Sequence, residues 1–199
     1  TAEPEGDNWR LTGVAPWVTG WGYIDVFHVA ARHGDDIVWS LVDARPSATM
    51  QAELLRLAAI NASGTFQIRL DNHLIEADRV TSIQPYDEWR DHYPHGLRVN
   101  GSLSLGVAER ARSLLGPSRF DSEFDEARAA LDAATVDELP EARGHVSALT
   151  VRLTASLVAS VGGRSIVADH HGQRLAREAL FLLIQGQTPE IKQSLLRHL

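Results

Sequence analysis

The residue types best suited to chemistry stand near the start of the chain, in the stretch PWVTGWG at residues 16–22. This stretch places two indoles, one hydroxyl and two glycines where a polar opening gives way to an apolar run. An apolar face beside a few well-placed polar groups is the usual way to hold a ligand, and Trp17 and Thr19 offer both. The alternative is a tryptophan buried between a sheet and a helical bundle, with a threonine favoured by its strand propensity.

A second group of functional residue types is DHHGQR, in which His170 and His171 follow Asp169. Adjacent side chains point about 100° apart on a helix, so the two imidazoles do not converge on one metal ion. The chain has no cysteine, which excludes disulfides, a thiol nucleophile and thiolate zinc sites. Phosphate loops and serine nucleophile elbows need glycine spacings that are missing here. These motifs therefore predict no metal site and no catalytic residue.

The composition bounds the class of protein. With 199 residues, 44% of them hydrophobic, the chain can build one large domain or two small ones. A net charge of −7 with interspersed arginines argues against a nucleic-acid surface. No run approaches the roughly 20 apolar residues of a membrane span, and no signal peptide precedes Trp9, so we expect a cytoplasmic protein. Because it starts at Thr1 and not at methionine, we expect a portion of something longer.

The first of the two halves that position these residues has a strand-like pattern, from Trp9 to about Val80. Short runs rich in valine, isoleucine, phenylalanine and tryptophan alternate with glycine, aspartate or asparagine turns. The predicted strands are WRLTG, DVFHVAAR, DIVWSLVDA and TFQIRLDNHLI. RHGDDIV indicates a hairpin with His33 to Asp36 at its tip. We therefore expect a small antiparallel β domain at residues 1–85.

The second half has helical spacing. It follows SIQPYDEWRDHYPHG, whose prolines and polar residues suit a connection. One predicted helix stops at Gly116, and the next opens with Asp121 or Ser122 as its cap. PEARGHVSALTVRLTASLVASVGG ends at a glycine pair, and QRLAREALFLLIQG and TPEIKQSLLRHL complete a set of four or five helices. The predicted fold class is α+β, with the β domain followed by a C-terminal helical bundle at residues 86–199.

Four stretches together resemble the acyl-CoA dehydrogenase family. GDNWRLTGVAPWVTGWGYIDVFHVAAR resembles its middle β domain, where a Leu-x-Gly strand end leads to a Trp-(Ile/Val)-Thr motif and then to a strand ending in Ala-Arg. LDNHLIEADRV is similar to the end of that domain, and SLSLGVAERARSLLG to the first helix of the C-terminal bundle. SVGGRSIVADHHGQRLAREALFLLIQGQTPEI is similar to the terminal signature, with its Gly-Gly, Arg-x-x-Arg-(Asp/Glu)-Ala and Gly-x-Thr-x-x-Ile. The four stand in the family's order and cover nearly the whole chain.

The resemblance implies FAD as the cofactor. In the family, the Trp of this motif packs on the flavin ring system, and the Thr hydroxyl bonds near its reactive nitrogen. Trp17 and Thr19 match these two positions, so the resemblance favours a flavin contact over a purely structural role. Apolar faces with a few placed hydrogen bonds suit such a ring.

The resemblance also implies contacts to the rest of FAD. Gly162 and Gly163 match the pair that lets the backbone approach the FAD pyrophosphate, often that of a neighbouring subunit. The alternative is a helix C-cap, and both can hold at once. Thr188 and Glu190 fall where the family's terminal signature touches FAD.

The family's catalytic base has no counterpart at the expected positions. Family members remove the α proton of an acyl-CoA with a glutamate while the flavin takes hydride from the β carbon. That glutamate aligns with Gly186, or with Gln185 after a one-residue slip, and neither side chain accepts a proton. Other members carry it on the first helix of the bundle, near Gly96. The family's N-terminal helical domain, with much of the acyl-binding wall, is expected to lie before Thr1.

Three functions fit this pattern. The first is an FAD-dependent oxidoreductase that acts on CH–CH groups of acyl-CoA thioesters in fatty acid metabolism, with its base supplied from elsewhere. The second is a catalytically silent acyl-CoA dehydrogenase-like subunit that supports FAD or a partner in a hetero-oligomer. The third is a structural assembly module.

Oligomerisation is expected through the helical bundle. The segments 147–163 and 177–186 are apolar around much of the helix circumference, which predicts a homo- or hetero-oligomer. Arginine at Leu157 or Leu183 would break that assembly if those residues face outward, or unfold the protein if they are core.

Overall fold

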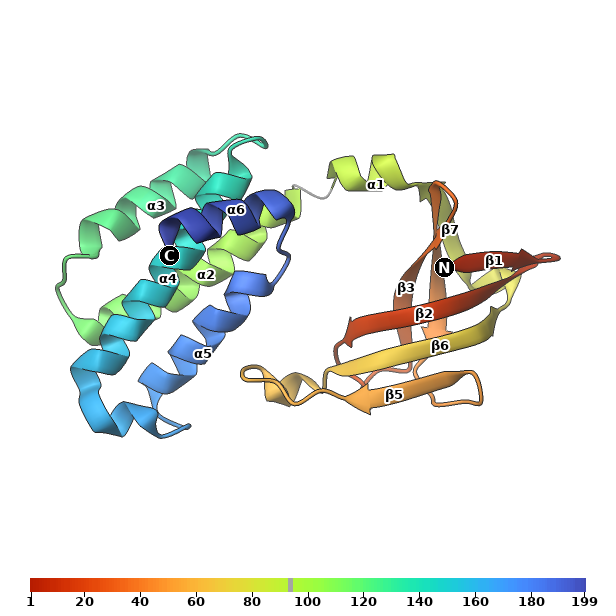
Figure 1. Ribbon diagram of the computed structural model, residues 1–199, viewed down its shortest axis with the longest axis horizontal. Coiled ribbons are helices and arrows are strands. Elements are labelled where there is room, and N and C mark those ends of the chain that lie inside the picture. Colours follow the sequence, from red (N-terminus) through yellow and green to blue (C-terminus); the bar gives the residue numbers. More distant parts are fainter. Residues whose placement is uncertain (93–94) are drawn as a thin grey trace. The chain divides into compact units, whose positions relative to one another are not determined.

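The computed structural model describes residues 1–92 and 95–199, and the chain divides into two compact units, Thr1–Asp91 and His92–Leu199. Each unit is built from one continuous stretch of chain and has its own core of buried apolar side chains. The first, the β unit, holds the strands, and the second, the helical unit, holds the bundle (Figure 1). The predicted α+β fold class is therefore confirmed.

The strands of the β unit form two antiparallel sheets. The first has the order β1-β2-β6-β5 and the second the order β3-β4-β7. Their bounds are β1 Ala2–Glu5, β2 Asn8–Val18, β3 Val26–His33, β4 Asp36–Asp43, β5 Met50–Leu54, β6 Phe66–Ile75 and β7 Val80–Pro85. Leu11 and Ile68 of the first sheet share one core with Val38 of the second. A short helix, α1 at Tyr86–His92, follows β7.

Three strands lie outside the predicted set. β1 is polar and contains Pro4, which an edge strand tolerates because one side of it has no ladder to maintain. β5 has the sequence MQAEL, whose residues favour a helix at least as well, and it is a strand because it pairs with β6. β7 lies in the stretch expected to be a connection and pairs with β4. The predicted hairpin is confirmed, with His33 opposite Asp36.

The helical unit is organised around one central helix. Its members are α2 His95–Leu115, α3 Asp121–Ala133, α4 Leu139–Val161, α5 His171–Ile184 and α6 Pro189–His198. α4 packs against α2, α3, α5 and α6. This central position explains why residues 147–163 are apolar around much of the helix: other helices of the same unit cover them. Leu157 is only 2% exposed and Leu183 packs against the core, so both are core positions and not an outer face.

Among the described residues, the segment Leu139–Ile166 is long and apolar enough, by length and composition alone, to cross a membrane. It contains all of α4, and its leucines at 149, 153 and 157 are part of the bundle core. Burial of these leucines within the unit explains why they are apolar.

The helix ends follow the sequence with one exception. Gly116 and Gly162 both have positive φ, +78° and +73°, and end α2 and α4 as predicted. The predicted cap of α3 by Asp121 or Ser122 is wrong. The carboxylate of Asp121 accepts a hydrogen bond from the N–H of Ser118, at 3.0 Å, in the turn before the helix. Phe120 occupies the cap position.

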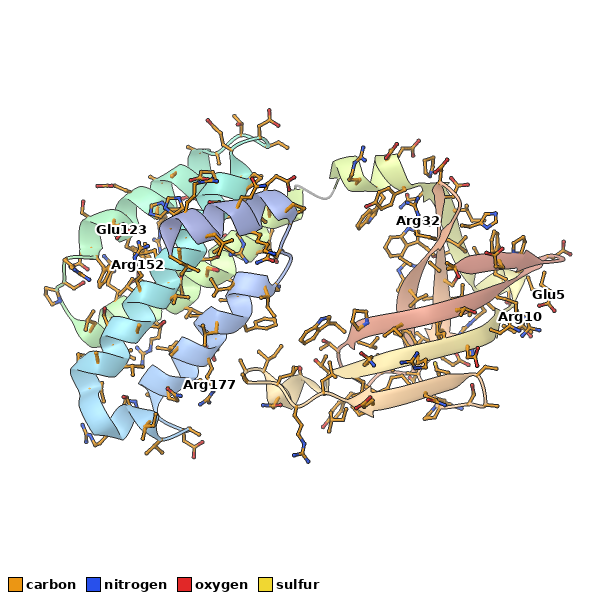
Figure 2. The ribbon with its side chains drawn as sticks, viewed as in Figure 1. Glu5, Arg10, Arg32, Glu123, Arg152 and Arg177 are labelled. Carbon is orange, nitrogen blue, oxygen red and sulfur yellow. The ribbon has the colours of Figure 1, made fainter. Side chains whose placement is uncertain are left out.

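Charged side chains and one close approach tie α4 to its neighbours. Glu123 of α3 pairs with Arg152 of α4, as Figure 2 shows, and is 3.1 Å from His145 Nε2. On the α6 side, Gly144 lets the two helices approach closely, because a Cβ there would collide with the side chain of Ser194. Glycine at this position therefore sets the distance between α4 and α6.

Candidate functional site

Trp17 lies near the end of β2, at an open strand edge. β1 pairs with β2 only as far as Leu11, so among the described strands residues 13–18 have a partner, β6, on one side alone. The pairing with β6 is irregular between Ala15 and Val18, around the bulge that contains Pro16 and Trp17. Trp17 is 51% exposed and is not part of the β core. Its indole is therefore available to a ligand.

A groove of about 340 Å³ follows this edge. Its walls come mainly from residues 11–18 of β2 and 28–31 of β3, with Trp39 of β4. His28 on the β3 wall is held by the Thr81 hydroxyl at 2.8 Å and by the Trp39 ring, whose centroid is 4.9 Å away. The groove thus offers apolar side chains and a strand edge, which suits a flat, largely apolar ligand. A larger groove of about 560 Å³ between β4 and β6 is lined by both charged and apolar residues and holds none of the predicted site residues.

The second indole of PWVTGWG has a structural role. Trp21 stacks on Phe66 with ring centroids 5.7 Å apart, and its ring centroid is 6.1 Å from that of Phe27. These contacts anchor the turn after β2 on the core of the β unit. Trp21 is thus packed within the β unit, whereas Trp17 lies outside its core.

The Thr19 hydroxyl belongs to a row of three hydroxyls. Its Oγ1 is 3.1 Å from Thr65 Oγ1, which is 2.7 Å from Ser63 Oγ. Two backbone hydrogen bonds, of 2.9 and 3.1 Å, join residues 20–21 to residues 63–64 beside this row. The hydroxyl of Thr19, two residues after Trp17, is thus held in place. Nothing in the sequence pattern marks Thr65 or Ser63, because these residues meet Thr19 only after folding.

The two glycines at the expected positions of the base lie on neighbouring elements of the helical unit. Gly96 is near the start of α2, and Gly186 follows α5 with φ +59°. Gln185 Nε2 donates to Asn100 Oδ1 at 3.3 Å, which joins the end of α5 to α2 one turn after Gly96. The fold therefore brings these two stretches together, and neither glycine supplies a carboxylate.

A buried arginine supports the same corner. Arg143 of α4 is 1% exposed and donates to the carbonyl oxygens of Leu182, at 3.0 Å, and Gln185, at 3.4 Å. It also donates to the hydroxyls of Ser104 and Ser147. A cation at the end of α5 satisfies carbonyls that have no partner within the helix and complements the helix dipole. Its one sequence signal is a lone arginine whose helical neighbours, apart from Ser147, are apolar.

Gly162 and Gly163 lie in an open part of the surface. A Cβ built on either residue would meet no atom within 4 Å. Gly162 is the C-cap of α4, and its carbonyl accepts from the Ser165 hydroxyl at 2.6 Å. The C-cap role is thus present, and the space around both glycines leaves their backbone open to a ligand.

Thr188 and Glu190 form the start of α6. Thr188 Oγ1 accepts from the Ile191 N–H at 3.3 Å, which makes Thr188 the N-cap. Hydrogen bonds from its own backbone N–H and from the Thr188 hydroxyl lower the pKa of Glu190. Both residues therefore stabilise the first turn of the helix.

One of the two neighbouring histidines, His170, has a structural role. The Nδ1 atom of His170 accepts from the Gly172 N–H at 3.1 Å and caps α5. Within residues 1–92 and 95–199, no three His, Asp or Glu side chains are grouped so as to hold a metal ion.

Comparison with known proteins identifies the fold. No protein-family model matches the sequence, and no curated protein is significantly similar to it. Among solved structures, the acyl-CoA dehydrogenase from Geobacillus kaustophilus matches with a TM-score of 0.81 and 15% identity, over 98% of this chain and 62% of that chain. Butyryl-CoA dehydrogenase from Megasphaera elsdenii matches with a TM-score of 0.77 and 15% identity, over 98% and 61%.

A glutaryl-CoA dehydrogenase from Mycobacterium smegmatis in complex with FADH2 matches with a TM-score of 0.70 and 20% identity, over 98% of this chain and 59% of that chain. The chain thus spans about three fifths of the length of these structures, which are 59% to 62% covered. Over that length, the chain has the acyl-CoA dehydrogenase fold.

Proposed function

We propose that this chain is a flavin-binding, acyl-CoA dehydrogenase-like oxidoreductase subunit. The observation that supports this most directly is the exposed indole of Trp17 at the open edge of β2, beside the fixed hydroxyl of Thr19, in a chain with this fold. When bound, FAD would supply the two-electron acceptor for oxidation of a CH–CH bond. The chain's own residues would bind the cofactor and orient it.

The described residues fit FAD in two places. In the β unit, Trp17 would pack on the flavin ring, and the groove along β2 would keep water away from it. In the helical unit, the open backbone at Gly162 and Gly163 would let a pyrophosphate approach, from this chain or a second one. Thr188 and Glu190 would contact FAD from the start of α6.

A second candidate is a catalytically silent subunit, and a specific observation favours it. Glycine stands both at residue 96 and at residue 186, where a base is expected. General base catalysis contributes about 10² to 10⁴ in rate, so its loss would leave flavin binding without turnover. Such a subunit would bind FAD and pair with an active homologue.

Assembly would use an exposed apolar surface of the helical unit. Val99 and Leu103 lie one turn apart on α2, and Leu180 and Ile184 lie one turn apart on α5; all four are exposed. We propose that these residues meet another chain or another domain of the same protein, that acyl-CoA is the substrate of the assembled protein, and that it acts in the cytoplasm.

An FAD titration followed by flavin absorbance tests the cofactor. Trp17 buries about 100 Å² more on contact with a ring, which at about 25 cal/mol/Å² corresponds to roughly 2.5 kcal/mol. Trp17→Ala should therefore weaken FAD binding about tenfold to a hundredfold. Ile83→Ala, at an equally exposed position on β7, is the matched control and should bind normally. Full flavin occupancy in Trp17→Ala would contradict the proposal.

A dye-reduction assay with short, medium and long acyl-CoAs separates the two candidates. A silent subunit shows no turnover when loaded with FAD. Gly96→Glu adds a carboxylate in a helix, where a Cβ meets no atom within 4 Å, and turnover gained by this variant would locate the missing base. Ordinary turnover by the unmutated chain would refute the silent subunit.

A further inference from the structure

We propose that the buried hydroxyl of Thr65, together with that of Ser63, positions the Thr19 hydroxyl for its contact with the flavin ring. The proposal rests on the flavin-binding function above. It assigns a role in the site to two residues that lie in the loop before β6, more than 40 positions away from Thr19 in the sequence.

The middle hydroxyl of the row, that of Thr65, is buried, and the two at its ends are more exposed. Thr65 is 1% exposed, Ser63 is half-buried and Thr19 is exposed. The Oγ atoms are 2.7 Å apart between Ser63 and Thr65 and 3.1 Å apart between Thr65 and Thr19. Hydrogen bonds at these distances polarise one another, so the Ser63 and Thr65 hydroxyls influence what the Thr19 hydroxyl offers a ligand.

The row can run in either direction because each hydroxyl has one hydrogen and can also accept. When Ser63 donates to Thr65 and Thr65 donates to Thr19, the Thr19 hydrogen is free to donate to a ligand. In the opposite direction Thr19 donates inward, and its oxygen can only accept from the ligand. The reactive ring nitrogen of a flavin accepts when oxidised and carries a hydrogen when reduced. The row can therefore meet both states without moving a heavy atom.

The loop that carries Ser63 and Thr65 is held in an unusual backbone conformation. Ile60 and Gly64 flank the short 3₁₀ turn Asn61–Ser63, and both have φ +55°. For a β-branched residue such as Ile60 this conformation is a true outlier, and such strain is most often found at functional sites. The Asn61 side chain fixes the loop by accepting from the Leu57 N–H at 2.9 Å.

Glycine at residue 64 also lets the loop approach the turn after β2. A Cβ on Gly64 would lie 3.2 Å from the carbonyl oxygen of Trp21, which is tighter than ordinary contact. The strained loop, the close approach and the two backbone hydrogen bonds all fix residues 63–65 against residues 19–21. This restraint keeps the Thr65 hydroxyl within hydrogen-bond distance of the Thr19 hydroxyl.

A double-mutant cycle with FAD tests the proposal. Thr65→Val keeps the shape of the side chain and removes its hydroxyl, and should weaken FAD binding about threefold to tenfold, as loss of one net hydrogen bond does. Thr65→Ser restores the hydroxyl and should bind nearly as the unmutated chain. In a Thr19→Val background, Thr65→Val should have no further effect on FAD affinity, because Thr65 acts through Thr19. The absorption bands of bound FAD should shift in Thr65→Val and return in Thr65→Ser.

The outcomes distinguish this proposal from the one on which it rests. If the unmutated chain binds no FAD, the flavin-binding function itself is wrong. If it binds FAD, and Thr65→Val binds equally well or has the same effect with and without the Thr19 hydroxyl, only the positioning role is overturned. If circular dichroism shows that Thr65→Val does not fold, Ser63→Ala, at the half-buried end of the row, replaces it. Its effect on FAD affinity is then measured in the unmutated and Thr19→Val backgrounds.

Discussion

Replacing Arg143 with methionine should destabilise the helical unit, although the site is buried and methionine is the more apolar residue. The guanidinium donates to two serine hydroxyls and to the carbonyls of Leu182 and Gln185. Methionine can fill the space of the aliphatic stem and donates no hydrogen bond. The two serine hydroxyls are 3.3 Å apart and can bond to each other. The two carbonyls at the end of α5 lose this donor.

The magnitude follows from those two carbonyls. A buried acceptor left without a partner costs about 1 to 3 kcal/mol, so two cost at most about 2 to 6 kcal/mol, and less here because the contact to Gln185 is only part-buried. Two facts lower this figure: the bond to Gln185 is long, at 3.4 Å, and the variant no longer buries a charge. We therefore expect Arg143→Met to lower the free energy of unfolding by about 2 to 3 kcal/mol.

Urea unfolding can assign this loss to the correct unit. All five tryptophans lie within residues 1–91, so tryptophan fluorescence follows the β unit, while far-UV ellipticity follows mainly the helices. The helical transition should move and the fluorescence transition should not. Arg110→Met, at an exposed arginine on α2, is the control and should change stability by less than about 0.5 kcal/mol. An Arg143→Met variant as stable as the unmutated chain would refute the view that the guanidinium holds the end of α5.

Three further expectations concern the helical unit. Leu157→Arg should unfold it, whereas Leu180→Arg should leave it folded; circular dichroism and sedimentation distinguish these outcomes, and a folded Leu157→Arg monomer would contradict the core assignment. Gly144→Ala should cost about 1 to 3 kcal/mol in urea unfolding, because the added methyl must push α4 and α6 apart, and an unchanged midpoint would argue against this close packing. The pKa of Glu141 is lowered from 4.5 to about 2, chiefly by its hydrogen bond with His198. Its stabilising effect is complete above pH 4.5 and is lost towards pH 2, so the difference in Tm between the unmutated chain and Glu141→Gln should narrow over that range, and a constant difference would contradict it.

The features that could be predicted from the sequence depend on local pattern. A glycine with positive φ ends α4 at Gly162, and the tip of the first predicted hairpin lies at His33–Asp36, because helix ends and tight turns need particular residue types at fixed offsets. The strand β5 could not be predicted in this way. Its residues are indifferent to the strand conformation, and it is a strand because β6 lies beside it.

The residues of the site likewise divide into those that the local sequence pattern marks and those that depend on distant partners. Trp17 and Thr19 stand out in the sequence because an unusual cluster of residue types surrounds them. Thr65 and Arg143 do not, since their partners are 46 and 39 positions away and no local period connects them. Trp17 is exposed and Trp21 is packed against other rings, and the sequence does not distinguish the two. The open edge of β2 at Trp17 arises because β1 pairs with β2 only as far as Leu11, and the pattern of apolar residues does not show where that pairing stops.

Because each unit is one uninterrupted stretch, the β unit can fold on the ribosome while residues 92–199 are still being synthesised. At about 5 to 20 residues per second, that interval lasts on the order of 5 to 20 s. During this time the free edge of β2 is exposed to other nascent chains, and such edges readily pair with foreign strands. Pro16 cannot donate a ladder hydrogen bond, and the bulge around it bends the strand. The bulge around Pro16, which lies along the groove, would thus also limit aggregation between nascent chains on neighbouring ribosomes of one messenger RNA.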